Sequence, residues 1–234
     1  MKKFVAILPL LFIATVSNAQ QAWPDTTHRN EVGVDVTTFL WQFLGQVSSD
    51  GVSNYAFVYP TPYWLTYRYH FQKHWNLRFA VGGTITNDEE PGLGGPTTET
   101  YTNKNSEIDL SIGAERAEEL GKRWQIFYGL DFRPAWFYQY TDFMYSNGGY
   151  QFGLEQRTTN MAVAPVLGIR YRITPRFRIL TEASLAFVST HKERRDISKP
   201  LVDGYPPLDD QTQTTDGFHT TFMPPLSVIA TFDL

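Results

Sequence analysis

The chain has 234 residues, of which 42% are hydrophobic and 19% are charged, and it contains no cysteine. This composition excludes a globally disordered chain, which combines low hydrophobicity with high net charge. The lack of cysteine excludes disulfides, thiolate nucleophiles and cysteine zinc sites, and a formal net charge of -4 gives no electrostatic basis for binding nucleic acid.

The N-terminus has the three parts of a secretory signal peptide. Two lysines precede an apolar run from Phe4 to Val16, and small residues lie three and one positions before a cut at Gln20. The apolar run is too short to cross a membrane as a helix. We therefore expect residues 1–19 to be a cleaved signal peptide, residues 20–30 to form a short periplasmic segment, and residues 31–234 to form one domain.

Apolar and polar residues then alternate with a period of two, which is the pattern of strands with one apolar face. In the clearest segment, every second residue from Trp124 to Phe132 is apolar or aromatic. In chain order the alternating segments are residues 32–36, 63–71, 77–81, 108–112, 124–132, 161–171, 179–187 and 222–234. The sequence therefore predicts eight strands, with local irregularity at Pro165, Pro224 and Pro225, because proline removes a hydrogen bond from the ladder.

In the first segment, the apolar residues switch from one face of the strand to the other near Thr37. Val34 and Val36 lie on one side, whereas Phe39 and Trp41 would lie on the other. A β-bulge near Thr37 and Thr38 would restore the face. Alternatively, the strand leaves the sheet at this point, and the sequence leaves both interpretations open.

Short and long connections between the segments alternate along the whole chain. The short ones are Gln72–His74, Glu119–Arg123 and Thr174–Arg176, and the long ones are residues 45–56, 86–105, 141–157 and 189–218. Such alternation is typical of an up-and-down barrel with short turns at one end and long loops at the other. No segment after residue 19 has eighteen uninterrupted apolar residues, and a closed barrel is the other structure that satisfies its backbone in lipid. We predict an all-β, eight-stranded antiparallel up-and-down transmembrane β-barrel.

The charged residues of these segments share the polar side. Eight strands enclose only enough space for side chains or one small ligand, so the large apolar residues are expected to face lipid and the charges to face inward. The expected lumen charge network consists of Asp35, Arg68, Arg78, Glu107, Asp109, Asp131, Arg133, Arg170, Arg178 and Glu182. This arrangement predicts a polar, salt-bridged and closed interior.

Aromatic residues gather near the ends of the predicted strands. The expected girdle consists of Trp41, Trp75, Trp124, Trp136, Tyr138, Tyr140 and Tyr171. Some of these lie beside the short turns and others near the long connections, as expected where amphipathic rings lie at both headgroup boundaries.

Together, the signal peptide, the alternating strands, the alternating connections and the terminal Phe232-Asp233-Leu234 resemble the small outer-membrane β-barrel proteins of Gram-negative bacteria, the OmpA-like and OmpX-like group of porin-family type. The resemblance implies an outer-membrane location, contact with outer-membrane lipid, and a C-terminal insertion signal at Phe232 and Leu234 that the assembly machinery recognises. The chain departs from the pattern because its last residue is leucine, and the aromatic residue lies two positions earlier.

No metal, cofactor or catalytic site is expected, because the five histidines lack zinc-binding spacing and the loop acids lack the pattern of a calcium hand. The favoured interpretation is a structural or surface-interaction barrel whose long loops meet an external ligand or surface. A narrow channel for small polar solutes is one alternative. A lipid A-modifying enzyme is another, for which His219 and Thr221 imitate a His-x-Ser arrangement but are predicted to face inward.

Overall fold

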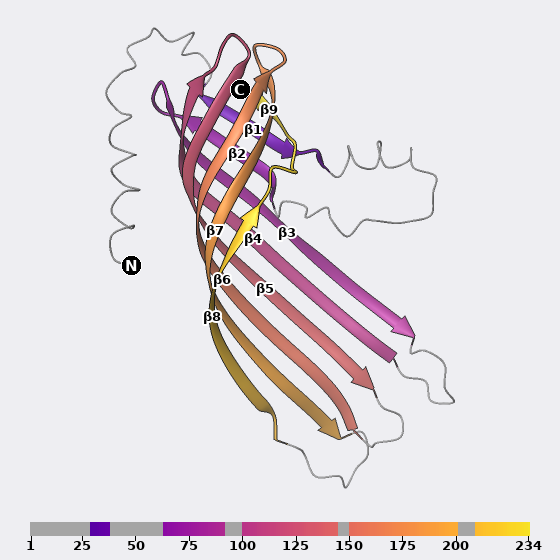
Figure 1. Cartoon of the computed structure of the whole chain (residues 1–234). Coiled ribbons are helices and arrows are strands. Elements are labelled where there is room, and N and C mark those ends of the chain that lie inside the picture. The colour runs from indigo at the N-terminus through magenta and orange to yellow at the C-terminus, as the bar shows by residue number, and fades with distance from the viewer. Residues whose placement is uncertain (1–28, 38–62, 92–99, 145–149, 201–208) are drawn as a thin grey trace, which may run out of the picture.

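The computed structural model describes residues 29–37, 63–91, 100–144, 150–200 and 209–234, and within them the chain forms one antiparallel sheet of nine strands (Figure 1). The predicted signal peptide, Trp41 and the segment 45–56 lie outside these residues. The strands are β1 (Asn30–Asp35), β2 (Tyr63–His70), β3 (Trp75–Pro91), β4 (Thr100–Glu119), β5 (Trp124–Met144), β6 (Tyr150–Arg172), β7 (Phe177–Pro200), β8 (Gln211–Met223) and β9 (Ile229–Asp233).

The sheet closes in a ring. Consecutive strands pair from β1 to β7, β7 pairs with β9, and β9 pairs with β1. The ring therefore contains β1 to β7 and β9, whereas β8 pairs with β7 farther along that strand. The predicted all-β, up-and-down antiparallel topology is confirmed.

The last predicted strand, residues 222–234, is divided in two, so the described residues form nine strands where the sequence predicted eight. β8 ends at Met223 directly before Pro224 and Pro225, and β9 begins at Ile229. Two consecutive prolines offer no backbone N–H to the ladder, which explains the break. At Pro165, the pairing of β6 with β7 is interrupted between Val163 and Val166 and resumes in the same register.

Most of the predicted long connections are strand, and this part of the prediction is wrong. β3 continues to Pro91, β5 to Met144 and β7 to Pro200, so much of 86–105, 141–157 and 189–218 belongs to paired strands. In the extension of β7, both faces are polar from Thr190 to Asp196, so alternation of hydropathy does not reveal it. The short turns were predicted closely, and Gly121 in one of them has a φ of 147°, a conformation that favours glycine.

β1 ends at Asp35; its pairing with β2 reaches Val34, and its pairing with β9 reaches Asp35. The side chain of Thr37 accepts a hydrogen bond from the backbone N–H of Val228 at 2.7 Å. Thr38, the second position of the expected bulge, lies outside the described residues.

The outer face of the ring carries large apolar side chains from every strand. We call the following residues the apolar belt: Val34, Leu65, Leu77, Phe79, Ile112, Leu130, Phe132, Val163, Leu167, Leu185, Phe187, Phe222 and Phe232, all of which are exposed. Among the described residues, no helix combines the length and the hydropathy that a membrane span needs. The ring is therefore apolar outside, and its inner face holds charged side chains.

Candidate functional site

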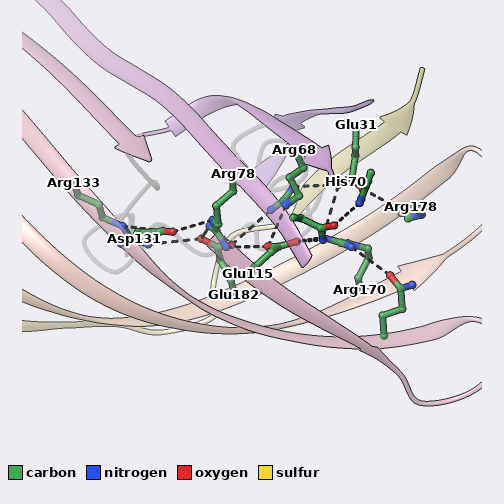
Figure 2. Close-up of polar contacts among 12 residues, drawn as sticks. Glu31, Arg68, His70, Arg78, Glu115, Asp131, Arg133, Arg170, Arg178 and Glu182 are labelled. Atoms are coloured by element: carbon green, nitrogen blue, oxygen red, sulfur yellow. Dashed lines mark hydrogen bonds and ion pairs between the residues drawn. The ribbon is translucent and has the colours of Figure 1, made fainter. Parts of the chain in front are cut away.

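Ten charged side chains meet inside the ring in a continuous series of ion pairs. Figure 2 labels all of them except Asp233. We call this group the interior cluster, and it consists of Arg68, Arg78, Arg133, Arg170, Arg178, Glu31, Glu115, Asp131, Glu182 and Asp233. Five guanidinium groups therefore face five carboxylates. Every strand of the ring contributes at least one member, so the cluster joins the whole circumference.

Glu115 on β4 lies at the centre of the interior cluster and is fully buried. Its carboxylate accepts hydrogen bonds from Arg170 at 2.8 Å, from Arg78 at 3.2 Å and from Arg68 at 3.4 Å, and Asn76 adds a fourth at 2.9 Å. Burying a charge is costly unless it is paired and hydrogen-bonded. Glu115 meets both conditions.

Arg78 connects the centre to β5 and β7, which lie on either side of β6. One of its terminal nitrogens donates to both carboxylate oxygens of Glu182, at 2.8 Å each. Its Nε lies 3.1 Å from Asp131, which in turn accepts a hydrogen bond from Arg133 at 2.9 Å. Arg78 therefore contacts three carboxylates from three strands, β4, β5 and β7.

Glu31 organises the end of the cluster next to the short turns. It accepts hydrogen bonds from Arg178 at 2.8 Å and from Arg68 at 3.2 Å, and Arg178 also binds Asp233. The ring of His70 lies 3.5 Å from Glu31, and the ligand atoms of Glu31, His70 and Asp233 are within 4.8 Å of one another. Because two guanidinium groups already neutralise these carboxylates, the trio fits an ion-pair network better than a metal centre.

One aromatic ring lies among the arginines. Phe127 is fully buried, and the guanidinium carbons of Arg170, Arg68 and Arg78 lie 5.1, 5.8 and 6.0 Å from its centroid. A Cβ at Gly168 would collide with this ring, so glycine makes room for it. Phe127 thus fills the space between the ions and offers them cation–π contacts in place of water.

Beside the interior cluster, toward the long ends of the strands, lies a cavity of about 520 Å³. We call it the acidic cavity, because Asp35, Glu107 and Asp109 line it. Asp35 accepts a hydrogen bond from the backbone N–H of Thr37 at 2.7 Å. These three residues were predicted as part of one lumen network, but the structure places them around a separate space, one layer farther along the strands.

Two central members of the cluster, Glu31 and Glu115, were not among the predicted site residues. Glu31 and Glu115 lie just outside the predicted strands 32–36 and 108–112, on the same face as the predicted acids. Extending the first segment by one residue and the second by three would have included them, because residues two apart share a face. Asp233 lies within the predicted strand 222–234, where alternation places it on the same inner face as Thr231, which is buried inside the ring.

The predicted aromatic residues that the structure describes lie toward the two ends of the apolar belt. Trp124 and Tyr171 are neighbours at the short-turn end, with ring centroids 4.6 Å apart, and Arg123 donates to the Tyr171 hydroxyl at 3.2 Å, which raises the pKa of Arg123. Trp136 and Tyr138 are exposed on the far part of β5. Trp75 and Tyr140 are half-buried.

No protein-family model matches the chain, and a search of curated proteins finds no match. Among solved structures, the chain is similar to the crystal structure of CarO from Acinetobacter baumannii, with 9% sequence identity and a TM-score of 0.33 over 88% of this chain and 97% of that chain. Values this low define no family for the chain.

Proposed function

We propose that the protein is an integral outer-membrane β-barrel with a closed, ion-paired interior and a structural or surface-interaction role. The observation that carries this proposal is the distribution of polarity. Exposed leucine, isoleucine, valine and phenylalanine side chains surround the ring, while arginine and carboxylate side chains are buried in it. A water-soluble protein has the opposite arrangement, whereas a small membrane barrel has this one.

The spacing of aromatic residues on β5 supports a membrane-spanning position. Trp124 and Trp136 both point outward on this strand and are twelve residues apart. At about 3.4 Å per residue, and with the tilt of about 40° that is usual for such strands, this separation is about 30 Å along the membrane normal. That distance matches the hydrocarbon thickness of a bilayer, which is about 30 Å.

We extend the proposal to biogenesis and partners. Counting β8 and β9 as one crossing gives the eight crossings of the OmpA-like and OmpX-like group. Phe232 and Leu234 are 54% and 65% exposed on the outer face, where the assembly machinery would bind an insertion signal. The polar extensions of β3 to β8 would then stand outside the cell, next to an external ligand or surface, while the apolar belt contacts lipid.

The lipid A-modifying alternative finds less support. His219 and Thr221 line the acidic cavity inside the sheet. The acyl chains of a lipid substrate would lie outside, against the belt, beyond hydrogen-bonding distance of both side chains. We therefore keep a non-enzymatic role as the proposal.

Membrane orientation can be tested by cysteine labelling, because the chain has no cysteine of its own. We expect a membrane-impermeant maleimide to label Asp209→Cys on intact cells, and Gln72→Cys only after the outer membrane is permeabilised. Leu167→Cys, in the apolar belt, should react only after denaturation. Equal labelling of positions 72 and 209 on intact cells, or rapid labelling of position 167 in the native protein, contradicts the proposed membrane position.

A closed interior predicts no ion conduction. The purified protein in planar bilayers should give no reproducible unitary current steps, because the interior cluster and Phe127 fill the ring. The double variant Arg78→Ala/Glu182→Ala, which removes two large side chains from the cluster, should conduct more often than the native protein. Regular steps from the native protein would favour the narrow channel instead.

A further inference from the structure

The acidic cavity differs chemically from the interior cluster beside it. In the cluster, carboxylates and guanidinium groups are equal in number. In the part of the cavity lining that the structure describes, Asp35, Glu107 and Asp109 are accompanied by a single arginine, Arg133. Arg133 is already bound to Asp131 at 2.9 Å and to the hydroxyl of Ser184 at 2.9 Å. The cavity therefore has an excess of negative charge.

Asp109 is the group that most needs a partner. Its side chain lines the cavity, and the residue is only 6% exposed. Its Oδ2 atom is buried and has no hydrogen-bond partner among the described residues. An unpaired buried carboxylate costs free energy, and Glu107, two residues away on the same face, adds a second negative charge. This pair of acids is complementary to a cationic ligand.

We infer that the acidic cavity binds small organic cations that carry protonated primary amines. A volume of about 520 Å³ holds such a molecule, and ligand pockets of this size are common. Ala135, Ala162, Ala186 and Val188 line the cavity and would contact an aliphatic chain. Asp109 and Glu107 would accept hydrogen bonds from the ammonium group, which are stronger than neutral ones.

A bare metal ion fits the cavity less well. Within the described part of the chain, the group of His and carboxylate ligand atoms close enough to share one ion is Glu31, His70 and Asp233, which belongs to the interior cluster. The three acids of the cavity do not form such a group, because their ligand atoms do not all lie within 4.8 Å of one another. Charges spread over a wide space with apolar walls suit an elongated organic cation better than a compact ion.

The interior cluster forms the floor of this site. Arg133 lies in both the cavity wall and the cluster, and it bonds to Asp131 on the cluster side. A bound cation would meet the guanidinium groups of the cluster beyond this point and be repelled by them. The cavity is therefore a site that retains a ligand, which adds a binding activity to the proposed structural role and does not require the membrane location.

The test is isothermal titration calorimetry of the full-length protein in detergent micelles with 1,4-diaminobutane as the probe. We expect saturable binding that weakens about tenfold or more in Asp109→Asn and in Glu107→Gln, because each removes a charge-assisted contact. Glu193→Gln is the matched control, since Glu193 is exposed on β7 and its change removes the same charge outside the cavity. 1,4-Butanediol, with the same chain and no charge, should not bind.

The melting temperature of Asp109→Asn tests separately whether this variant folds. Without ligand, Asp109→Asn should melt at the same temperature as the native protein or higher, because it removes an unpaired buried charge. Loss of probe binding in this stable variant supports the site. Undiminished binding in Asp109→Asn, equal binding of the diol, or no heat at millimolar probe overturns it.

Discussion

Arg78→Ala is expected to lower the free energy of unfolding by about 3 to 5 kcal/mol, because it removes one partner from a dry, buried ion-pair network. Arg78 contacts Glu182, Glu115 and Asp131, and each of these carboxylates loses a compensating charge in the variant. Urea unfolding in detergent micelles or lipid vesicles, followed by tryptophan fluorescence, measures the change.

Two further variants separate the interior cluster from ordinary surface ion pairs. Arg194→Ala breaks the exposed pair with Asp196, whose atoms are 3.1 Å apart, and should cost at most about 1 kcal/mol. The double variant Arg78→Ala/Glu182→Ala should cost less than the sum of its two single variants, because the second change removes a carboxylate that the first left unpaired. Equal costs for Arg78→Ala and Arg194→Ala would show that the interior is solvated.

Leu167→Arg is expected to destabilise the protein in a lipid bilayer by about 2 to 4 kcal/mol, the cost of an arginine near the midplane on the lipid face of a membrane barrel. Leu167 is 54% exposed in the apolar belt on β6. In a water-soluble protein, the same change at an exposed position would alter stability by no more than about 0.5 kcal/mol. Reversible unfolding in phospholipid vesicles measures the difference.

Thr214→Arg is the matched control, because Thr214 is exposed on β8, beyond the belt. We expect this variant to unfold like the native protein. If Leu167→Arg and Thr214→Arg have the same small effect in vesicles, the belt does not face hydrocarbon, and the proposed membrane position is wrong.

The topology and the two faces were predictable from the sequence, because the contrast between neighbouring side chains is large within the belt. From Leu77 to Val81 and from Trp124 to Phe132, every outward residue is apolar, and the inward ones are small, polar or charged apart from Phe127. The strand extensions were not predictable in this way. From Thr190 to Asp196, for example, β7 has polar residues on both faces, so its pairing with β6 depends on backbone hydrogen bonds and leaves little trace in hydropathy.

The sequence predicted which kinds of side chain face the interior better than it predicted which of them contact one another. Alternation places Arg68, Arg78 and Asp131 on the inner face, where the structure has them. Alternation along one strand does not show which residues of the next strand lie at the same height in the barrel. That height depends on the stagger between neighbouring strands. For this reason Glu107 and Asp109 were grouped with the arginines, although they lie around a separate cavity, and Glu115 was missed.

The length of the paired strands beyond the belt has a consequence for recognition. β6 and β7 remain in register as far as Tyr150 opposite Pro200, so this part of the surface is hydrogen-bonded sheet. A protein that binds to backbone already ordered in a sheet avoids the entropy loss of ordering a flexible segment. Antibodies raised against the folded protein that bind this region should therefore recognise a conformational epitope. The denatured chain, or short linear peptides from this region, should compete poorly for these antibodies.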